Sequence, residues 1–183
     1  MTTKLFNLFT ISILGAAMFL TSCKKEIDAS FTKDFDGVNF TLDTTSQVGA
    51  FSIAGTDVQS NLSQLASDKG FDISKIKKVV LKTCTLTMND SLNTPAQTFN
   101  VLDSVYAQLS GTNLSTLKVG SSNPVLHNNS TTLTLSMKNS DVAPYLKADK
   151  FSFIVGGASN AAITHKVPMT AKLTFEITAT ITK

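Results

Sequence analysis

The chain has 183 residues, a formal net charge of +3 and two cysteines. Its 16 basic side chains are all lysines, which excludes a phosphate or carboxylate clamp built on the two-pronged arginine side chain. A charge this close to neutral also excludes the strongly basic surface of a nucleic-acid-binding protein.

The first segment has the parts of a secretory signal peptide. Lys4 precedes an apolar run at residues 5–20, and small residues follow this run just before Cys23. Polar residues interrupt the run, which falls short of the ~20 residues that a membrane-spanning helix needs. We therefore predict a signal peptide over residues 1–22 in preference to a transmembrane anchor.

The residues Leu20-Thr21-Ser22-Cys23 resemble the bacterial lipoprotein box. This resemblance implies that Cys23 becomes the first residue of the mature protein and carries acyl chains, such as palmitate, on its sulfur and its amine. At roughly 0.8 kcal/mol per buried CH₂, several long chains would hold the protein on a bilayer. The alternative is an ordinary signal peptide with an incidental cysteine.

A charged segment follows, and we interpret residues 23–36 as a lipidated tether. Lys24-Lys25-Glu26 resembles the sorting stretch of surface-exposed Bacteroidetes lipoproteins, but Ile27 interrupts the acidic run. The resemblance implies an outer-membrane lipoprotein and leaves both the periplasmic face and the cell surface open. Without residues 1–22 the chain keeps 161 residues, and we predict one domain over residues 37–183.

Strand patterns fill that domain, because apolar and polar residues alternate in most segments. We predict strands near residues 38–42, 48–53, 76–88, 102–109, 117–119, 133–137, 151–155 and 167–181. One helix is predicted at residues 60–70, with Ser60 as its N-cap and Gly70 as its stop. Residues 141–147 resemble a single helical turn that Asp141 caps. Gly156 and Gly157 are expected to end the strand before them.

Two strands carry further information. Val79 and Leu81 are odd-numbered whereas Cys84 and Leu86 are even-numbered, which predicts a bulge or a sharp bend near Lys82 to Thr83, where the strand would pass to the other sheet. In the last strand, eight apolar residues alternate without a break. Pro168 places its start at an edge or a bulge, because proline donates no backbone hydrogen bond.

These patterns predict a mainly β fold: an antiparallel two-sheet β-sandwich, immunoglobulin-like or jelly-roll, with one short helix in a crossover. A closed barrel is the alternative. Over residues 56–178, the segments KIKKVVLKTCTLTM, FNVLDSVYAQL, PYLKADKFSFIV and TFEITA resemble small uncharacterised Bacteroidetes outer-membrane lipoproteins. That resemblance implies a β-sandwich on an outer membrane and gives no activity.

Candidate chemistry is sparse, and we predict no catalytic residue, cofactor or bound metal. His127 and His165 show no zinc-site spacing and are interpreted as solvated loop residues. Cys84, without a partner for a disulfide, is interpreted as a small buried hydrophobe. Asp34 and Asp36 provide too few oxygen ligands for a calcium loop.

Two short motifs suggest modification. Asp90-Ser91-Leu92 and Asp103-Ser104-Val105 resemble the three-residue acceptor for O-glycosylation in Bacteroidetes periplasmic proteins. The resemblance implies Ser91 and Ser104 as candidate acceptors.

Our first hypothesis is a non-catalytic, envelope-anchored lipoprotein that binds a protein or a glycan through its loops. The candidate surfaces are Asn89 to Thr98, Gly120 to Thr132 and Gly156 to His165. One alternative is a hydrolase, which requires a pocket with a histidine beside a carboxylate. The other is an assembly component that uses strand addition at the C-terminal strand or another exposed edge. The sequence does not indicate an oligomeric state.

Overall fold

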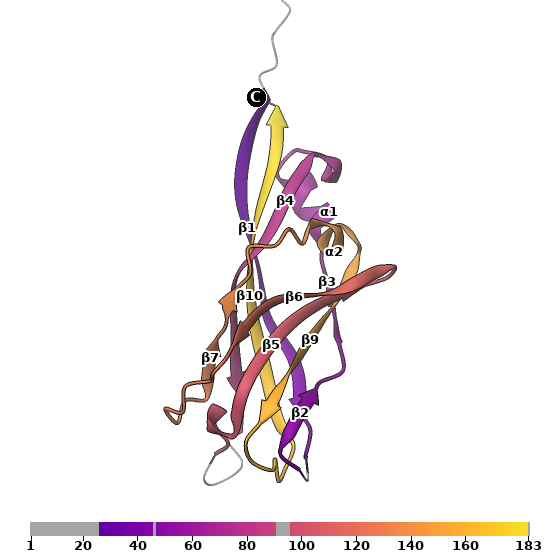
Figure 1. Cartoon of the computed structure of the whole chain (residues 1–183). Coiled ribbons are helices and arrows are strands. Elements are labelled where there is room, and N and C mark those ends of the chain that lie inside the picture. The colour runs from indigo at the N-terminus through magenta and orange to yellow at the C-terminus, as the bar shows by residue number, and fades with distance from the viewer. Residues whose placement is uncertain (1–25, 46, 91–95, 183) are drawn as a thin grey trace, which may run out of the picture.

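The computed structural model describes residues 26–45, 47–90 and 96–182, which form two antiparallel β-sheets packed face to face (Figure 1). The mainly β, two-sheet sandwich predicted from the alternating pattern is confirmed. Cys23 and Ser91 lie outside the described residues, so the lipidation site and one candidate glycosylation site stay predictions. Neither described helix has the length and apolar content needed to span a bilayer.

One sheet has the strand order β1-β10-β4-β7; the other has the order β2-β9-β5-β6-β8, with β3 also paired to β9. The strands are β1 (Glu26–Leu42), β2 (Gly49–Ser52), β3 (Thr56–Gln59), β4 (Ile76–Met88), β5 (Leu102–Gly111), β6 (Leu114–Ser122), β7 (Thr132–Thr134), β8 (Ser136–Met137), β9 (Lys150–Ser159) and β10 (Val167–Thr182). The helices are α1 (Leu62–Asp68) and α2 (Ala143–Lys147), with 3₁₀ turns η1 (Ile73–Lys75) and η2 (Phe99–Val101). The second helical element agrees with the turn predicted at residues 141–147.

Strand β1 begins earlier than the predicted domain. Residues 26–36, interpreted above as tether, belong to β1 and pair with β10 from Glu26 opposite Thr182 onward. Their acidic side chains lie on the outer face, while the alternate residues, Lys33 among them, are half-buried. A bulge between Phe35 and Val38 shifts the alternation, so odd-numbered residues face inward before it and even-numbered residues after it. Gly37 lies in this bulge with a φ of 75°, a conformation that favours glycine.

Ion pairs cover the outer face of β1, β10 and β4 and of the adjoining turn η1: Glu26–Lys75 at 3.0 Å, Asp28–Lys77 at 2.7 Å, Asp36–Lys172 at 3.0 Å and Glu176–Lys82 at 3.2 Å. Hydrogen bonds from Lys77 and Thr180 hold the pKa of Asp28 below its ordinary value. Such exposed pairs add little stability individually, because water and salt screen them. They explain how a charged segment forms a strand.

Strand β10 has the predicted alternation, with every odd-numbered residue from Val167 to Ala179 buried. The placement of Pro168 at an edge is wrong, because β10 lies between β1 and β4. Pro168 is the second residue of the strand, and its carbonyl oxygen accepts a hydrogen bond from the Asn89 N–H at 2.7 Å. Pro168 therefore lies just beyond the end of the β10–β4 ladder, whose last pair is Met169 opposite Met88.

Strand β4 has the predicted bulge: Thr83 lies opposite Thr174 and Leu81 opposite Phe175, which leaves Lys82 as the extra residue. The predicted change of sheet does not occur there, since β4 pairs with β10 on both sides of the bulge. A passage from one sheet to the other without a loop occurs later, at Leu135, which alone separates β7 in one sheet from β8 in the other.

Aromatic side chains fill the centre of the sandwich. The buried Phe175 ring packs edge-to-face against Phe35, at 5.5 Å between centroids, and against Phe151, at 6.1 Å. Cys84 is also fully buried, and this burial raises the pKa of its thiol to about 12. Its interpretation as a buried hydrophobe is confirmed.

Helix α1 ends as predicted. The Gly70 N–H donates to the Ser67 carbonyl and the Phe71 N–H to the Ala66 carbonyl, which is a Schellman motif with Gly70 at φ 76°. The predicted N-cap is displaced by one residue to Asn61, although the Ser60 Oγ still accepts from the Leu62 N–H at 3.4 Å.

Gly156 and Gly157 lie inside β9 instead of ending it. A Cβ atom on Gly157 would approach the Ser104 carbonyl oxygen to 1.9 Å, and one on Gly156 would meet the Tyr106 ring. These glycines therefore allow close approach between β9 and β5. Because β9 continues to Ser159, residues 160–165 remain of the candidate surface Gly156 to His165.

Candidate functional site

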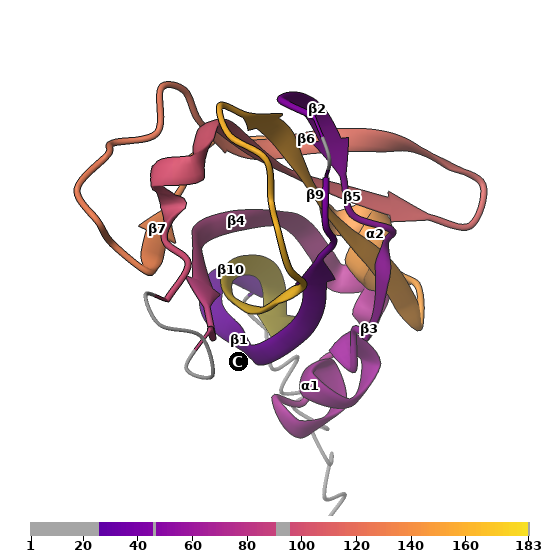
Figure 2. The same cartoon turned by 90° about the horizontal axis from the view of Figure 1, so that it is seen from below.

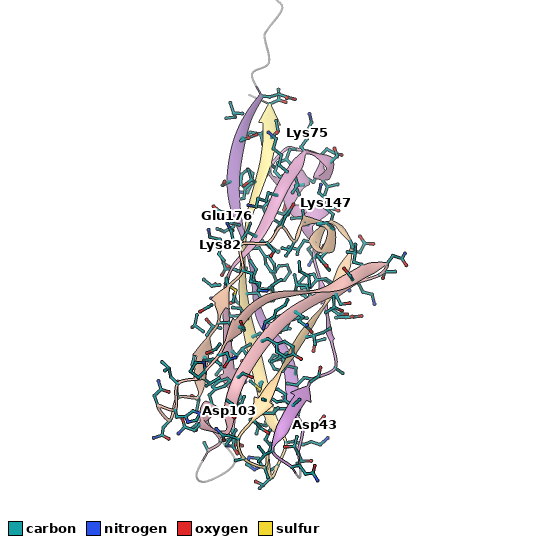
Figure 3. All side chains as sticks on the ribbon, viewed as in Figure 1. Asp43, Lys75, Lys82, Asp103, Lys147 and Glu176 are labelled. Carbon is teal, nitrogen blue, oxygen red and sulfur yellow. The ribbon has the colours of Figure 1, made fainter. Side chains whose placement is uncertain are left out.

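Strand β1 connects the two ends of the molecule. Glu26 pairs with Thr182 at one end, and Leu42 pairs with Val167 at the other. At about 3.3 Å per residue, its 17 residues span roughly 50 Å. Figure 3 shows Asp43 near the end of the molecule opposite Lys75. The chain therefore enters the described fold at one end, and several of its connections lie at the other.

Four connections meet at that second end, which we call the loop end. It comprises the described residues 43–45, 47–48, 89–90, 96–101, 123–131 and 160–166. The register places them together, because Met88, Leu102, Ser122, Thr132 and Ser159 all lie at this end of their strands. Figure 2 views the molecule from below and shows these connections around the ends of the strands. The three candidate surfaces predicted from the sequence are thus brought together.

Amide side chains connect three of these loops. The Asn160 Nδ2 donates to the Asn100 carbonyl at 3.0 Å and to the Asp103 carboxylate at 3.1 Å, and lies 3.3 Å from the His127 Nε2. Asn100 and Asn129 exchange two hydrogen bonds, at 2.5 and 2.9 Å. His127 is exposed in the 123–131 connection, so its interpretation as a solvated loop residue is confirmed, and its imidazole also contacts this network.

His165 contacts a buried acid. Its Nε2 lies 2.8 Å from Asp90 Oδ2, and the Asp90 side chain is 1% exposed while that of His165 is 32% exposed. The same carboxylate oxygen accepts from the Gln97 N–H at 2.7 Å. Asp90 therefore joins the 89–101 connection to the 160–166 connection. The solvated interpretation is wrong for His165, which is half-buried against this carboxylate, and no local pattern predicts the pair because the two partners lie 75 positions apart.

The hydrolase alternative requires a histidine beside a carboxylate, and the Asp90–His165 pair meets this one requirement. The hydroxyl of Thr164 lies 3.3 Å from the other imidazole nitrogen, but Thr164 is exposed. Nucleophilic catalysis needs a shielded hydroxyl with donors placed for the developing oxyanion. Thr164 does not meet that requirement, so the contacts favour a structural role for Asp90 and His165.

Two large apolar side chains are exposed on the described surface, and both belong to the loop end. Val48 is 62% exposed and Leu126 is 72% exposed. Leu126 lines a hollow of about 370 Å³ together with apolar side chains and several hydroxyls, including Phe99, Pro124, Leu133, Ser130 and Thr132. Exposed apolar groups beside hydrogen-bonding groups are typical of protein-binding surfaces.

The other candidate residues are placed as follows. Ser104 is half-buried in β5, which pairs with β9 and β6 on its two sides. Asp34 accepts from the Thr174 hydroxyl at 2.6 Å and Asp36 pairs with Lys172, so each of these carboxylates already has a partner. Within the described residues, no group of three or more metal-ligating side chains is present.

No family model matches the chain, and no curated protein matches it. A solved structure from Desmodium yellow mottle tymovirus aligns with 100% of this chain and 98% of its own, at 11% identity and a TM-score of 0.28. A structure from Cocksfoot mottle virus aligns with 97% of this chain and 95% of its own, at 11% identity and a TM-score of 0.28.

Proposed function

We propose that the protein is a non-catalytic, envelope-anchored binding module whose loop end contacts a partner protein. The observation that supports this function most is the position of the loop end, at the opposite end of β1 from Glu26. Cys23 precedes Glu26 by three residues. A lipid on Cys23 would leave the loop end pointing away from an outer membrane, toward the periplasm or the cell surface.

A protein fits the loop end better than a glycan does. Sugars pack against exposed aromatic rings, whereas no aromatic residue is among the exposed large hydrophobics of the described surface. Leu126 and Val48 instead offer two aliphatic side chains next to hydrogen-bonding loops. Aliphatic contacts surrounded by polar groups are the usual composition of a protein interface.

The anchor is tested first. Cells grown with a clickable palmitate analogue should label the wild-type protein, and the Cys23→Ala variant should lose the label. Equal labelling of the two proteins, or no labelling of either, would remove the membrane anchor from the proposal.

The binding surface is tested by photo-crosslinking in the native envelope. A benzoyl-phenylalanine at position 126 should give a discrete protein adduct, which the change Val48→Asp should weaken severalfold. The matched control places the same group at Thr112, an exposed residue in the β5–β6 turn outside the loop end. The same adduct from both positions, or no adduct from position 126, would contradict the proposal.

A further inference from the structure

The two sheets are joined on one side and open on the other. On the closed side the chain passes from β7 to β8 through Leu135, whose N–H donates to the Cys84 carbonyl at 3.0 Å. On the open side β1 faces β3, and neither the described ladders nor the described backbone bonds link the two. The Thr56 hydroxyl reaches the Asn39 carbonyl there at 3.4 Å. The described strands therefore do not close into a barrel, and an unpaired gap, which we call the seam, separates β1 from β3.

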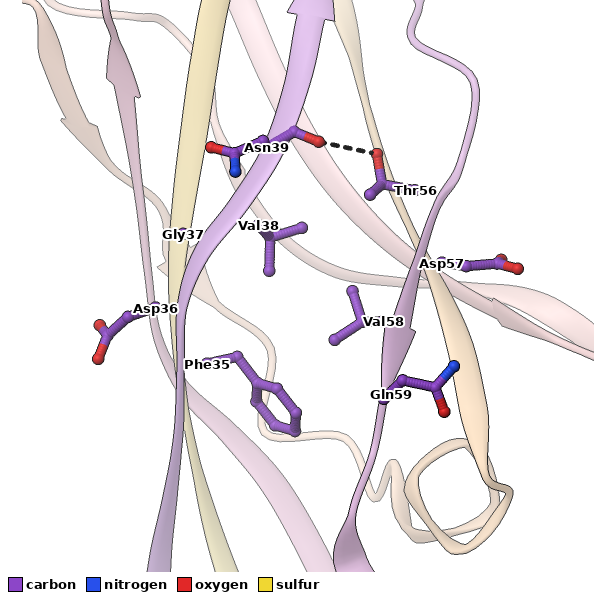
Figure 4. Close-up of a pocket in the computed structure, with 9 residues that line it drawn as sticks. All are labelled: Phe35, Asp36, Gly37, Val38, Asn39, Thr56, Asp57, Val58 and Gln59. Carbon is purple, nitrogen blue, oxygen red and sulfur yellow. Dashed lines mark hydrogen bonds between the residues drawn. The ribbon is translucent and has the colours of Figure 1, made fainter.

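This seam, defined by residues 35–39 of β1 and 56–59 of β3, forms a groove of about 380 Å³. Figure 4 shows Val38 and Val58 pointing into the space between the two strands, with Phe35 directed into it below them. Val38 and Val58 are 7% and 8% exposed. The groove thus has an apolar floor, and a strand edge forms each of its walls.

The β1 edge extends beyond the groove. Strand β1 pairs with β10 along one side over nearly its whole length, while β3 has only four residues. A second hollow is lined by Ser30, Phe31 and Thr32 of β1 together with Lys69, which follows α1, and Glu176 of β10. Backbone groups of an edge strand that point away from its neighbour are free to pair with another chain. The accessible edge therefore covers about residues 30–39.

We propose that this edge accepts an extended segment of a partner protein as an added strand. The segment pairs its backbone with β1 between Ser30 and Asn39, and its alternate side chains enter the seam beside Val38 and Val58. The hypothesis of strand addition at the C-terminal strand is corrected by this geometry, because β10 is central and both of its sides are paired. The proposal goes beyond the function assigned to the loop end and does not depend on it.

Charge indicates what the segment contains. Between Ser30 and Asn39 the outward row of β1 carries Asp34 and Asp36 and no lysine, and Glu26 and Asp28 continue this acidic row toward the start of the strand. The lysines that pair with Glu26, Asp28 and Asp36 belong to η1, β4 and β10. Residues directly opposite each other on neighbouring strands interact, and opposite charges stabilise the pair. The added strand should therefore alternate basic residues, facing the acidic row, with apolar residues that face the seam.

The same row disfavours a second copy of this chain as the occupant. Two β1 strands paired antiparallel about Phe31 would set Glu26 opposite Asp36 and Asp28 opposite Asp34. Like charges directly opposite each other destabilise a strand pair. Charged residues on an edge also discourage non-specific pairing, so the test must separate strand addition from a purely protective role.

The first experiment uses the full-length lipoprotein in detergent micelles and a nine-residue capped peptide that alternates lysine and valine. Hydrogen exchange should slow at β1 amides between residues 30 and 39 when the peptide binds. The control peptide has the same sequence with N-methyl groups on alternate backbone nitrogens. Its affinity should fall at least tenfold, because one edge of its backbone can no longer donate. Equal affinity of the two peptides, or slowed exchange elsewhere only, would overturn the proposal.

The second experiment reverses the charge of the row. The change Asp34→Lys should weaken the lysine–valine peptide at least fivefold and strengthen a glutamate–valine peptide. The matched control, Asp68→Lys, makes the same charge change on α1 and should leave both affinities within twofold. If the two substitutions changed the affinities equally, general electrostatic attraction would explain the binding, and the proposal would be overturned. If Asp34→Lys does not fold, the N-methyl comparison on the wild-type protein still decides.

Discussion

The two ends of the molecule are built in different ways. At the Glu26 end, strands β1, β10 and β4 continue in register and carry ion pairs on their outer face. At the loop end, four connections leave the strands, and amide and imidazole contacts hold them together. The exposed Val48 and Leu126 both belong to the loop end. The contrast suggests a rigid spacer at one end and a recognition surface at the other.

The largest loss of stability is expected from a change in the hydrophobic core, which supports both ends of the molecule. Replacing Phe175 by alanine removes a fully buried ring that packs on Phe35 and Phe151. We expect the free energy of unfolding to fall by about 3–5 kcal/mol in urea titrations, because a cavity remains in the core. The control Val48→Ala should change it by less than about 0.5 kcal/mol. A similar loss for both variants would contradict the assigned core.

The next largest loss of stability is expected when a glycine of β9 is replaced. Gly157→Ala places a methyl group against the Ser104 carbonyl, so β9 and β5 must separate. Overpacking of this kind is expected to cost about 3 kcal/mol in the free energy of unfolding. Gly55→Ala is the milder control, because its nearest neighbours are side-chain carbons at 3.1 and 3.2 Å. If the two substitutions cost the same, the close approach of the strands does not limit stability.

A smaller effect belongs to the loop end alone. Asp90→Ala leaves the Gln97 N–H without this acceptor and removes the contact of His165. We expect a loss of about 1–2 kcal/mol in the free energy of unfolding, the cost of an unpaired buried polar group. In hydrogen-exchange measurements on this variant, backbone amides of the 89–101 connection should exchange faster than in the wild type, while those of β1 keep their protection. Uniform loss of protection along the chain would show that the loop end does not open independently.

The smallest effect concerns the exposed Asp57–Lys150 pair on β3 and β9. Hydrogen bonds from Lys150 and Ser152 hold the pKa of Asp57 below its ordinary 3.8, and Asp57 raises the pKa of Lys150 above 10.5. The contribution of Asp57 is therefore present above pH 3.8 and lost as the pH falls through its folded pKa. That of Lys150 is present below pH 10.5 and lost as the pH rises through its folded pKa.

Two variants separate these limbs of the pH profile. Asp57→Asn should flatten both limbs of thermal stability, because it removes the titrating carboxylate and the partner of Lys150. Lys150→Gln should flatten the alkaline limb and part of the acid limb, where Ser152 still donates to Asp57. One molar salt should reduce all of these differences. A profile that neither substitution changes would show that the pair contributes nothing in solution.

The sequence predicts the elements whose signal is local. The alternation in β10, the bulge at Lys82 and the stop at Gly70 each follow from a few neighbouring residues. The extent of β1 was missed, because its acidic residues are paired by lysines 49 positions away and resemble a solvated linker. Gly157 was misread because the need for glycine arises from a neighbouring strand.

The loop end was predicted only in part. Its three surfaces follow from the turn-rich composition, but their meeting depends on strand register, which the sequence does not reveal. The pairing of Asp90 with His165 depends on contacts between distant segments. Val48 and Leu126 carried no local signal, since Val48 begins the predicted strand at residues 48–53 and Leu126 follows Val125, which is buried.

The most direct test of the account measures which end lies near the membrane. Full-length, acylated protein is placed in vesicles that contain a spin-labelled lipid, with a fluorophore on Ser30→Cys or on Leu126→Cys. Cys84 should stay unlabelled at pH 7, because it is fully buried and its thiol pKa is about 12. The account predicts strong quenching at position 30 and little at position 126. Equal quenching, or stronger quenching at position 126, would contradict an anchor and a binding surface at opposite ends.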